Sequence, residues 1–212
     1  MMADDPAQLA LASLLAGLRH DLNNPLSIIV AQAELLEYEA AGTPAAARAA
    51  TIRRAADRVA GIVQTALVGP GDSGLVATPI AADVVAKPAA RTALVVDDEP
   101  ELAESLADLL GLLGFTVAVA PSGTAAKARL LGARYDLIVS DLRMPDCDGP
   151  GLFAWLVDAR PEMIPAVAFS TGDTLGANAA RFLGESSRPF MEKPFTLAAV
   201  RALVDAVDRA RP

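Results

Sequence analysis

The region from residue 91 to residue 212 alternates short apolar runs with segments of helical periodicity, and this alternation limits the possible folds most strongly. Runs of strand-forming apolar residues occupy 93–96, 115–119, 136–140, 166–169 and 190–192. Apolar residues recur every three or four positions in 101–113, 124–131, 152–159, 175–183 and 197–209. Five such pairs in about 120 residues predict one parallel sheet, doubly wound, with helices on both faces.

The third apolar run ends in a carboxylate. Leu137–Ser140 lies between Gly132 and the Met144-Pro145 turn, which is typical of a fully buried strand and places Asp141 at its carboxyl end. Ligands bind at this edge of open α/β sheets, so Asp141 is a candidate reactive group. The alternative is a solvated aspartate that caps the following turn.

Other polar side chains are expected at the same edge of the sheet. Asp97 and Asp98 follow the first strand, Thr171 follows the fourth and Lys193 follows the fifth. Three carboxylates placed together raise one another's pKa unless a cation joins them, and Mg²⁺ prefers such oxygen ligands. A carboxylate can attack phosphorus to form an aspartyl phosphate. Mg²⁺ and the Lys193 ammonium would neutralise the phosphoryl charge, and the Thr171 hydroxyl would donate to a phosphoryl oxygen.

The region from residue 6 to residue 68 predicts two antiparallel helices. Apolar residues recur at helical spacing, Gly42 and Thr43 mark a stop and a cap, and Pro44 suits the first position of a second helix. A lone hairpin has no second layer that would bury its apolar stripe. Two copies that form a four-helix bundle remove this problem, so we expect a homodimer through residues 6–68.

Four motifs resemble those of the receiver domain of two-component signalling. They are Leu94-Val95-Val96-Asp97-Asp98-Glu99-Pro100, Ser140-Asp141-Leu142-Arg143-Met144-Pro145-Asp146-Cys147-Asp148-Gly149, Thr171-Gly172 and Glu192-Lys193-Pro194-Phe195. The resemblance covers residues 91–212 and implies a flavodoxin-like (CheY-like) α/β fold with Asp141 as the phosphoacceptor. By this resemblance, Mg²⁺ is held by Asp97, Asp98, Asp141 and the backbone carbonyl of Arg143.

The same resemblance gives roles to four further positions. Thr171 and Lys193 contact the phosphoryl group, Pro194 follows a cis peptide bond, and Phe190 occupies the position of the aromatic switch residue. The alternative is a degenerate receiver that keeps the fold without the chemistry, although no key position is substituted.

His20, the chain's single histidine, lies in the segment Arg19-His20-Asp21-Leu22-Asn23-Asn24-Pro25-Leu26. It lies about 200° around the helix from Leu18, so we expect it to point away from the apolar stripe and toward solvent. The segment resembles the H-box of sensor histidine kinases, and the match extends over residues 9–68. It implies that His20 is a phosphorylatable histidine, Asp21 its acidic partner and Asn24 the residue that positions water for phosphatase action. A structural bundle with an unused H-box is the alternative.

Residues 69–90 are expected to form a linker, because helical periodicity stops there and Gly and Pro recur. Hybrid histidine kinases place an ATP-binding domain between the hairpin and the receiver, and about twenty residues are too few to contain one. No Gly-rich nucleotide loop occurs elsewhere in the sequence. We therefore expect no autonomous phosphorylation from ATP, while phosphotransfer and phosphoaspartate hydrolysis stay open.

Composition argues against several other functions. A formal net charge of −8 argues against general affinity for nucleic acid. No apolar run is long enough to cross a bilayer, and the acidic start Met1-Met2-Ala3-Asp4-Asp5 is unlike a signal peptide. A single cysteine allows no intramolecular disulfide. We expect a cytoplasmic protein that does not contact the membrane.

The sequence favours a dimeric phosphorelay protein. Its receiver accepts a phosphoryl group on Asp141 from a phosphohistidine, either of a cognate histidine kinase or of His20, and signals through contacts with a downstream receiver or phosphotransfer protein. One alternative is a scaffold that docks a histidine kinase under the control of the receiver. Another is a phosphatase that uses Asp21 and Asn24 on a partner receiver.

Overall fold

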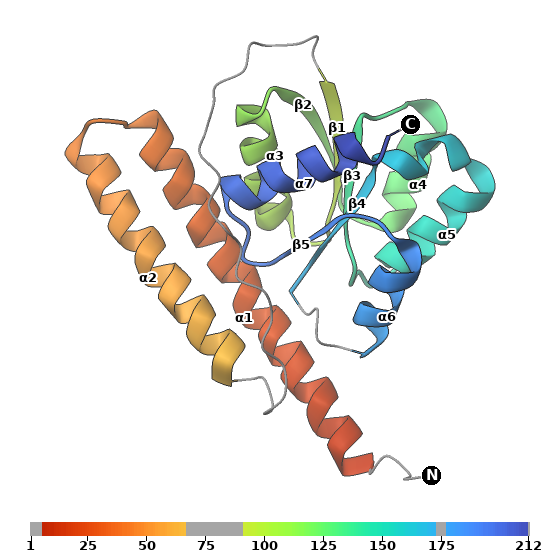
Figure 1. Ribbon diagram of the computed structural model, residues 1–212, viewed down its shortest axis with the longest axis horizontal. Coiled ribbons are helices and arrows are strands. Elements are labelled where there is room, and N and C mark those ends of the chain that lie inside the picture. The colour runs from red at the N-terminus through yellow and green to blue at the C-terminus, as the bar shows by residue number, and fades with distance from the viewer. Residues whose placement is uncertain (1–5, 67–90, 173–176, 212) are drawn as a thin grey trace.

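The computed structural model describes residues 6–66, 91–172 and 177–211. It consists of a helical hairpin and an α/β domain, with the first helix of the hairpin running along one side of that domain (Figure 1). The linker expected at residues 69–90 lies outside the described residues, as does the beginning of the helix expected at 175–183.

The hairpin consists of two antiparallel helices, α1 (Pro6–Glu39) and α2 (Pro44–Ala66). Gly42 adopts a positive φ of 81°, which favours glycine, and Thr43 Oγ1 accepts a hydrogen bond from Ala46 N at 3.4 Å. The predicted stop and restart of the helix are therefore confirmed.

The α/β domain contains one five-stranded parallel sheet in the order β2-β1-β3-β4-β5. Its strands are β1 (Arg91–Val96), β2 (Phe115–Ala120), β3 (Leu137–Asp141), β4 (Val167–Thr171) and β5 (Phe190–Glu192). The prediction of a doubly wound parallel sheet is confirmed.

Each strand is followed by a helix: α3 (Pro100–Leu112), α4 (Gly123–Gly132), α5 (Gly149–Ala159), α6 (Ala177–Ser186) and α7 (Leu197–Arg209). Helix α5 begins three residues before the predicted Leu152, because Asp148 caps it: Asp148 Oδ1 accepts a hydrogen bond from Gly151 N at 2.8 Å. A short 3₁₀ helix at Pro161–Ala166 was not expected, since six residues are too few to establish a periodicity.

The sheet has an apolar core on each face. On one face, β1 and β3 pack against α3 and α7 through Val95, Val139, Leu106 and Leu203. On the other face, the same strands pack against α4, α5 and α6 through Leu94, Ile138, Leu130, Leu156 and Leu183. Strands covered on both sides explain why their sequences are continuously apolar rather than alternating.

The hairpin has a smaller core of its own. It is formed by Leu26, Val30, Ala56, Ala60 and Val63. The small alanines of α2 are buried in this core, where the sequence predicted that the two helices approach closely. Arg53 Nε also donates to Glu37 Oε1 at 2.8 Å and joins α2 to α1.

Helix α1 packs against the α/β domain as well as against α2. Ala31 and Leu35 of α1 are buried in the core cluster of α3 and α7, and Ile28 packs against that cluster. Ala31 and Leu35 lie outside the predicted apolar stripe, so the sequence did not predict that this face of α1 packs against the α/β domain. Periodicity shows which residues share a helix face, but not which neighbour will cover that face.

Within the parts of the chain that the structure describes, no helix combines the length and the apolar character that a membrane span requires.

Candidate functional site

The candidate site lies at the carboxyl edge of the sheet, where β1 and β3 are neighbours and the direction of winding reverses. Asp97 follows β1, and Asp141 is the last residue of β3. Thr171 ends β4, and Lys193 follows β5. The structure therefore brings together the strand-end residues that the sequence predicted to converge.

Lys193 lies between two carboxylates in the interior. Its Nζ is 3.1 Å from Asp97 Oδ2 and 3.3 Å from Asp141 Oδ1, and its side chain has no solvent-exposed surface. Burial by itself would lower the pKa of Lys193, but the charges of Asp141 and Asp97 outweigh this effect and raise it. Lys193 is therefore a protonated cation held at the phosphoacceptor candidate. The Lys193–Pro194 peptide bond is cis, as predicted.

Asp141 is only 2% exposed, and this burial raises its pKa to about 7, against the opposing effect of the Lys193 charge. The Asp97 charge contributes to the same rise. Asp141 Oδ2 is buried and makes no hydrogen bond to any described residue. A buried carboxylate oxygen without a partner is costly, so it is expected to be a binding or reacting atom.

Three carboxylates fit a divalent cation. One oxygen each from Asp97, Asp98 and Asp141 lie within 4.8 Å of one another. Asp97 Oδ1 also accepts a hydrogen bond from Glu99 N at 3.0 Å, which fixes the carboxylate that follows β1. Three such hard oxygen ligands, one of them from the buried Asp141, are the donor set that Mg²⁺ prefers.

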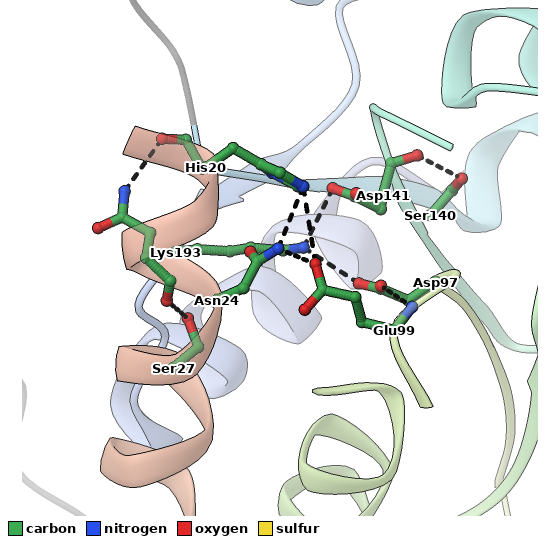
Figure 2. A network of polar contacts seen from close by, with 10 residues as sticks. His20, Asn24, Ser27, Asp97, Glu99, Ser140, Asp141 and Lys193 are labelled. Carbon is green, nitrogen blue, oxygen red and sulfur yellow. Dashed lines mark hydrogen bonds and ion pairs between the residues drawn. The ribbon is translucent and has the colours of Figure 1, made fainter. Parts of the chain in front are cut away.

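His20 lies against the α/β domain and not in solvent, which corrects the expectation from the sequence. Its side chain is 22% exposed, and its Nε2 lies 3.6 Å from Glu99 Oε1 (Figure 2). Burial, followed by the positive charges of Lys193 and Arg143, lowers the pKa of His20 and favours the neutral imidazole. His20 does point away from the apolar stripe, as predicted, but the α/β domain covers the face on which it lies.

Two asparagines of the H-box hold α1 to this edge of the sheet. Asn24 Nδ2 donates to Glu99 Oε1, and Asn23 Nδ2 donates to Gly172 O at 3.1 Å. A methyl group on Gly172 would lie 3.5 Å from His20 Cα, which is an ordinary van der Waals contact, so the segment after β4 lies directly beside α1. Sequence reasoning missed Asn23 and Glu99, because no local pattern indicates a contact between distant segments.

An open cavity of about 350 Å³ lies beside His20. It is lined by His20, Leu142, Arg143, Met144, Pro145 and Asp148. The loop after Asp141 therefore forms one wall and His20 forms part of another. The cavity gives space for a phosphoryl group between the two elements.

Other predicted residues lie farther from this centre or at its surface. Asp21 is exposed, whereas Asn24 is buried and His20 is partly buried at the interface. Arg143 is exposed in the loop after β3 and lines the cavity with His20. Phe190, at the start of β5, is 45% exposed.

Two family models match the chain. The model described as the response regulator receiver domain matches residues 93–205, and that of the His Kinase A (phospho-acceptor) domain matches residues 10–68. The chain belongs to the response regulator receiver domain family. The His Kinase A model matches the hairpin, so both resemblances found in the sequence are confirmed. These are domains of phosphorelay signal transduction, and the α/β domain is called the receiver below.

The matches to curated relatives are about as long as the receiver. The transcriptional regulatory protein GlrR of Escherichia coli is 35% identical over 120 residues, which are 56% of this chain and 27% of GlrR. The transcriptional regulatory protein FixJ of Rhizobium meliloti is 34% identical over 119 residues, or 56% of each chain. This chain therefore spans 27% of one relative's length and 56% of the other's.

Solved receiver structures share the fold. A CheY-like receiver domain from Methanospirillum hungatei aligns with a TM-score of 0.52 at 20% identity, covering 57% of this chain and 97% of that one. The receiver of an HD domain-containing protein from Pseudomonas fluorescens aligns with a TM-score of 0.51 at 24% identity, covering 57% and 98%. At this identity the likeness establishes the fold alone.

Proposed function

We propose that the protein acts in a phosphorelay, in which Asp141 accepts a phosphoryl group from a phosphohistidine. The observation that carries this proposal is a buried carboxylate whose Oδ2 makes no hydrogen bond to the residues that the structure describes, placed beside the Lys193 ammonium and two further carboxylates. In the transfer, an Asp141 oxygen attacks phosphorus and the bond between phosphorus and the donor nitrogen breaks. A cognate histidine kinase is the ultimate source of the phosphoryl group.

Three carboxylates and one backbone carbonyl are the proposed Mg²⁺ ligands. They are Asp97, Asp98, Asp141 and the carbonyl of Arg143, and the oxygens of the three side chains already lie within 4.8 Å of one another. When bound, Mg²⁺ supplies positive charge that offsets the negative charge of the carboxylates and of the phosphoryl oxygens.

Residues of the chain itself hold the phosphoryl group. Lys193 contributes a fixed positive charge 3.3 Å from Asp141 Oδ1. Thr171, buried at the end of β4, donates its hydroxyl hydrogen to a phosphoryl oxygen. Phe190 on the neighbouring strand is exposed and responds to that contact as the aromatic switch residue.

We also propose that the hairpin forms a homodimer. One stripe of α1 and the adjacent side of α2 expose large apolar side chains: Leu14, Leu18, Leu22, Ile29, Leu36, Ile52, Val59 and Ile62. This stripe is continuous with the hairpin core and is not covered by the receiver. A second copy of the hairpin fits it, because two such stripes together form the core of a four-helix bundle.

The phosphoacceptor is tested with Mg²⁺ and acetyl phosphate as the phosphodonor. Wild type is expected to gain base-labile phosphate, and Asp141→Ala is expected to gain none. Asp146→Ala, in the loop that follows, removes an exposed aspartate and serves as the matched control. Equal labelling of wild type and Asp141→Ala would show that another residue accepts the phosphoryl group.

A second candidate function, phosphatase activity, is favoured by the position of Asn24. Its Oδ1 is buried at the receiver site without a hydrogen bond to any described residue, so it can orient a water molecule. Asn24→Ala is then expected to slow the decay of aspartyl phosphate. An unchanged decay rate in this variant would argue against hydrolysis assisted by the H-box.

A further inference from the structure

The contact between α1 and the receiver continues well beyond the H-box. Gln32 Nε2 donates to Ser105 Oγ of α3 at 3.3 Å, and Glu34 Oε2 accepts from Leu197 N of α7 at 2.5 Å. The second bond satisfies the first amide of α7, which has no acceptor within its own helix. In both hydrogen bonds, α1 contributes the side-chain atom.

Apolar side chains fill the interface between these polar contacts. Ala31 is fully buried and Leu35 is 9% exposed, and both belong to the core cluster that includes Leu102 and Leu106 of α3. From His20 to Leu35 the interface extends about 22 Å along α1. Helix α1 of the same chain therefore covers part of the surface of α3 beside the receiver site.

At the H-box end of the interface, the His20 imidazole extends from α1 toward Asp141 (Figure 2). Its Nε2 lies 3.1 Å from Asn24 Nδ2. An amide nitrogen donates and does not accept, so the neutral ring carries its lone pair on Nε2 and its proton on Nδ1. The nucleophilic nitrogen therefore lies at the rim of the receiver site, beside the open cavity.

We infer that the phosphoryl group moves between Asp141 and His20 of the same chain, so the transfer partner of this receiver is its own hairpin. This inference rests on the proposed function. From Asp141 to His20, the Nε2 lone pair attacks phosphorus, and the bond from phosphorus to the Asp141 oxygen breaks with its electron pair left on the carboxylate. The proton stays on Nδ1, so the ring becomes a phosphorylated imidazolium and the total charge is unchanged. The reverse step returns the group to Asp141.

The first experiment loads full-length protein with Mg²⁺ and acetyl phosphate, then measures base-labile aspartyl phosphate and acid-labile phosphohistidine separately. Wild type is expected to contain both, His20→Gln only aspartyl phosphate, and Asp141→Ala neither. Aspartyl phosphate without phosphohistidine in wild type overturns this inference and leaves the proposed function intact. Absence of aspartyl phosphate overturns the proposed function itself.

A mixed-chain experiment separates transfer within a chain from transfer between chains. His20→Gln and Asp141→Ala chains are co-expressed, purified together and loaded in the same way. Transfer within a chain predicts no phosphohistidine, because the chain that can load Asp141 has no histidine. Phosphohistidine on the Asp141→Ala chain would overturn the inference.

An interface variant tests the docked arrangement. Ala31→Arg places a charge in the buried contact with α3, eleven residues from His20, and is expected to lower phosphohistidine about tenfold while aspartyl phosphate is unchanged. Ala47→Arg, at an exposed position of α2, is the matched control and is expected to change neither. Undiminished phosphohistidine in folded Ala31→Arg overturns the inference. If Ala31→Arg does not fold, the mixed-chain experiment decides, since it leaves the apolar contact of Ala31 and Leu35 with α3 unchanged.

Discussion

At the scale of single residues, the site combines a buried carboxylate with a buried ammonium. Asp141 and Lys193 are both nearly inaccessible to water, and such a pair is stabilising only while each partner neutralises the other. Two carboxylates share the one lysine, because Asp97 lies 3.1 Å from the same Nζ. The folded protein therefore has an excess of buried negative charge at this point, which a proton or a cation can relieve.

The first prediction concerns pH and stability. Because folding raises the pKa of Asp141 from 3.8 to about 7, the contribution of this residue to stability is fully present below the lower value and is lost as the pH rises through the higher one. The Asp141→Asn variant has no carboxyl group at this position that could ionise. Between pH 5 and pH 8, in EDTA to remove divalent cations, its free energy of unfolding should therefore rise by about 2 kcal/mol relative to that of wild type. Urea unfolding at both pH values measures this difference. Exposed Asp146→Asn should show no such trend, and a pH-independent effect of Asp141→Asn would contradict the prediction.

The second prediction concerns the buried cation. Lys193→Met leaves two buried carboxylates without their partner and is expected to destabilise the protein without Mg²⁺ by about 3 kcal/mol. Added Mg²⁺ should restore part of this loss, because it neutralises the same carboxylates. Thermal unfolding with and without Mg²⁺ measures both effects. Lys127→Met, which removes a lysine 5.9 Å above the Trp155 ring, is the control and should show little dependence on Mg²⁺.

At the scale of elements, α1 has three faces with three different surroundings. Leu26 and Val30 face α2, Ala31 and Leu35 face the receiver, and Ile29 belongs to the exposed apolar stripe. At 100° per residue, His20 lies about 180° from the middle of that stripe. Dimerisation through the stripe and docking of the H-box are therefore compatible in one molecule.

The third prediction tests the exposed stripe as the dimer contact. Ile29→Lys places a charge on the stripe without touching the receiver interface, and it should weaken the dimer at least tenfold by the usual cost of burying a charge. Sedimentation equilibrium of the full chain measures this change. Ala47→Lys, on a different side of α2, should dimerise like wild type. A wild-type protein that is monomeric at all concentrations would exclude the dimer.

At the scale of the whole molecule, the hairpin and the receiver form one packed unit. Hydrogen bonds at both ends of the interface and a shared apolar core between them connect α1 to α3 and α7. The H-box is consequently held at the receiver site by packing several turns away. Undocking is expected to require the separation of this whole interface.

The fourth prediction reports on docking directly. The Leu197 amide donates to Glu34 Oε2, so its hydrogen exchange should be slow in wild type and about tenfold faster in Ala31→Arg. Exchange of the Leu197 amide in the full chain can be followed by NMR. The Val139 amide, in the middle of the buried strand β3, is an internal control and should stay protected in both proteins. Equal protection of Leu197 in both proteins would contradict docking through Ala31.

The sequence by itself determined the elements, the parallel sheet and the convergence of Asp97, Asp141 and Lys193. Each of these follows from local periodicity and from the rule that parallel strands end at one edge. Helix α5 begins earlier than predicted because the Asp148 side chain caps it, and hydrophobic periodicity carries no information about such a cap.

Only the tertiary structure decided that the face of α1 that carries His20 packs against the receiver. The sequence placed His20 on the side of α1 away from the apolar stripe, and that was right. Its burial depends on contacts between residues far apart in the chain: 75 positions separate Asn24 from Glu99, and 163 separate Glu34 from Leu197. No local pattern encodes such pairs, because a polar residue that faces water and one that faces another domain have the same periodicity.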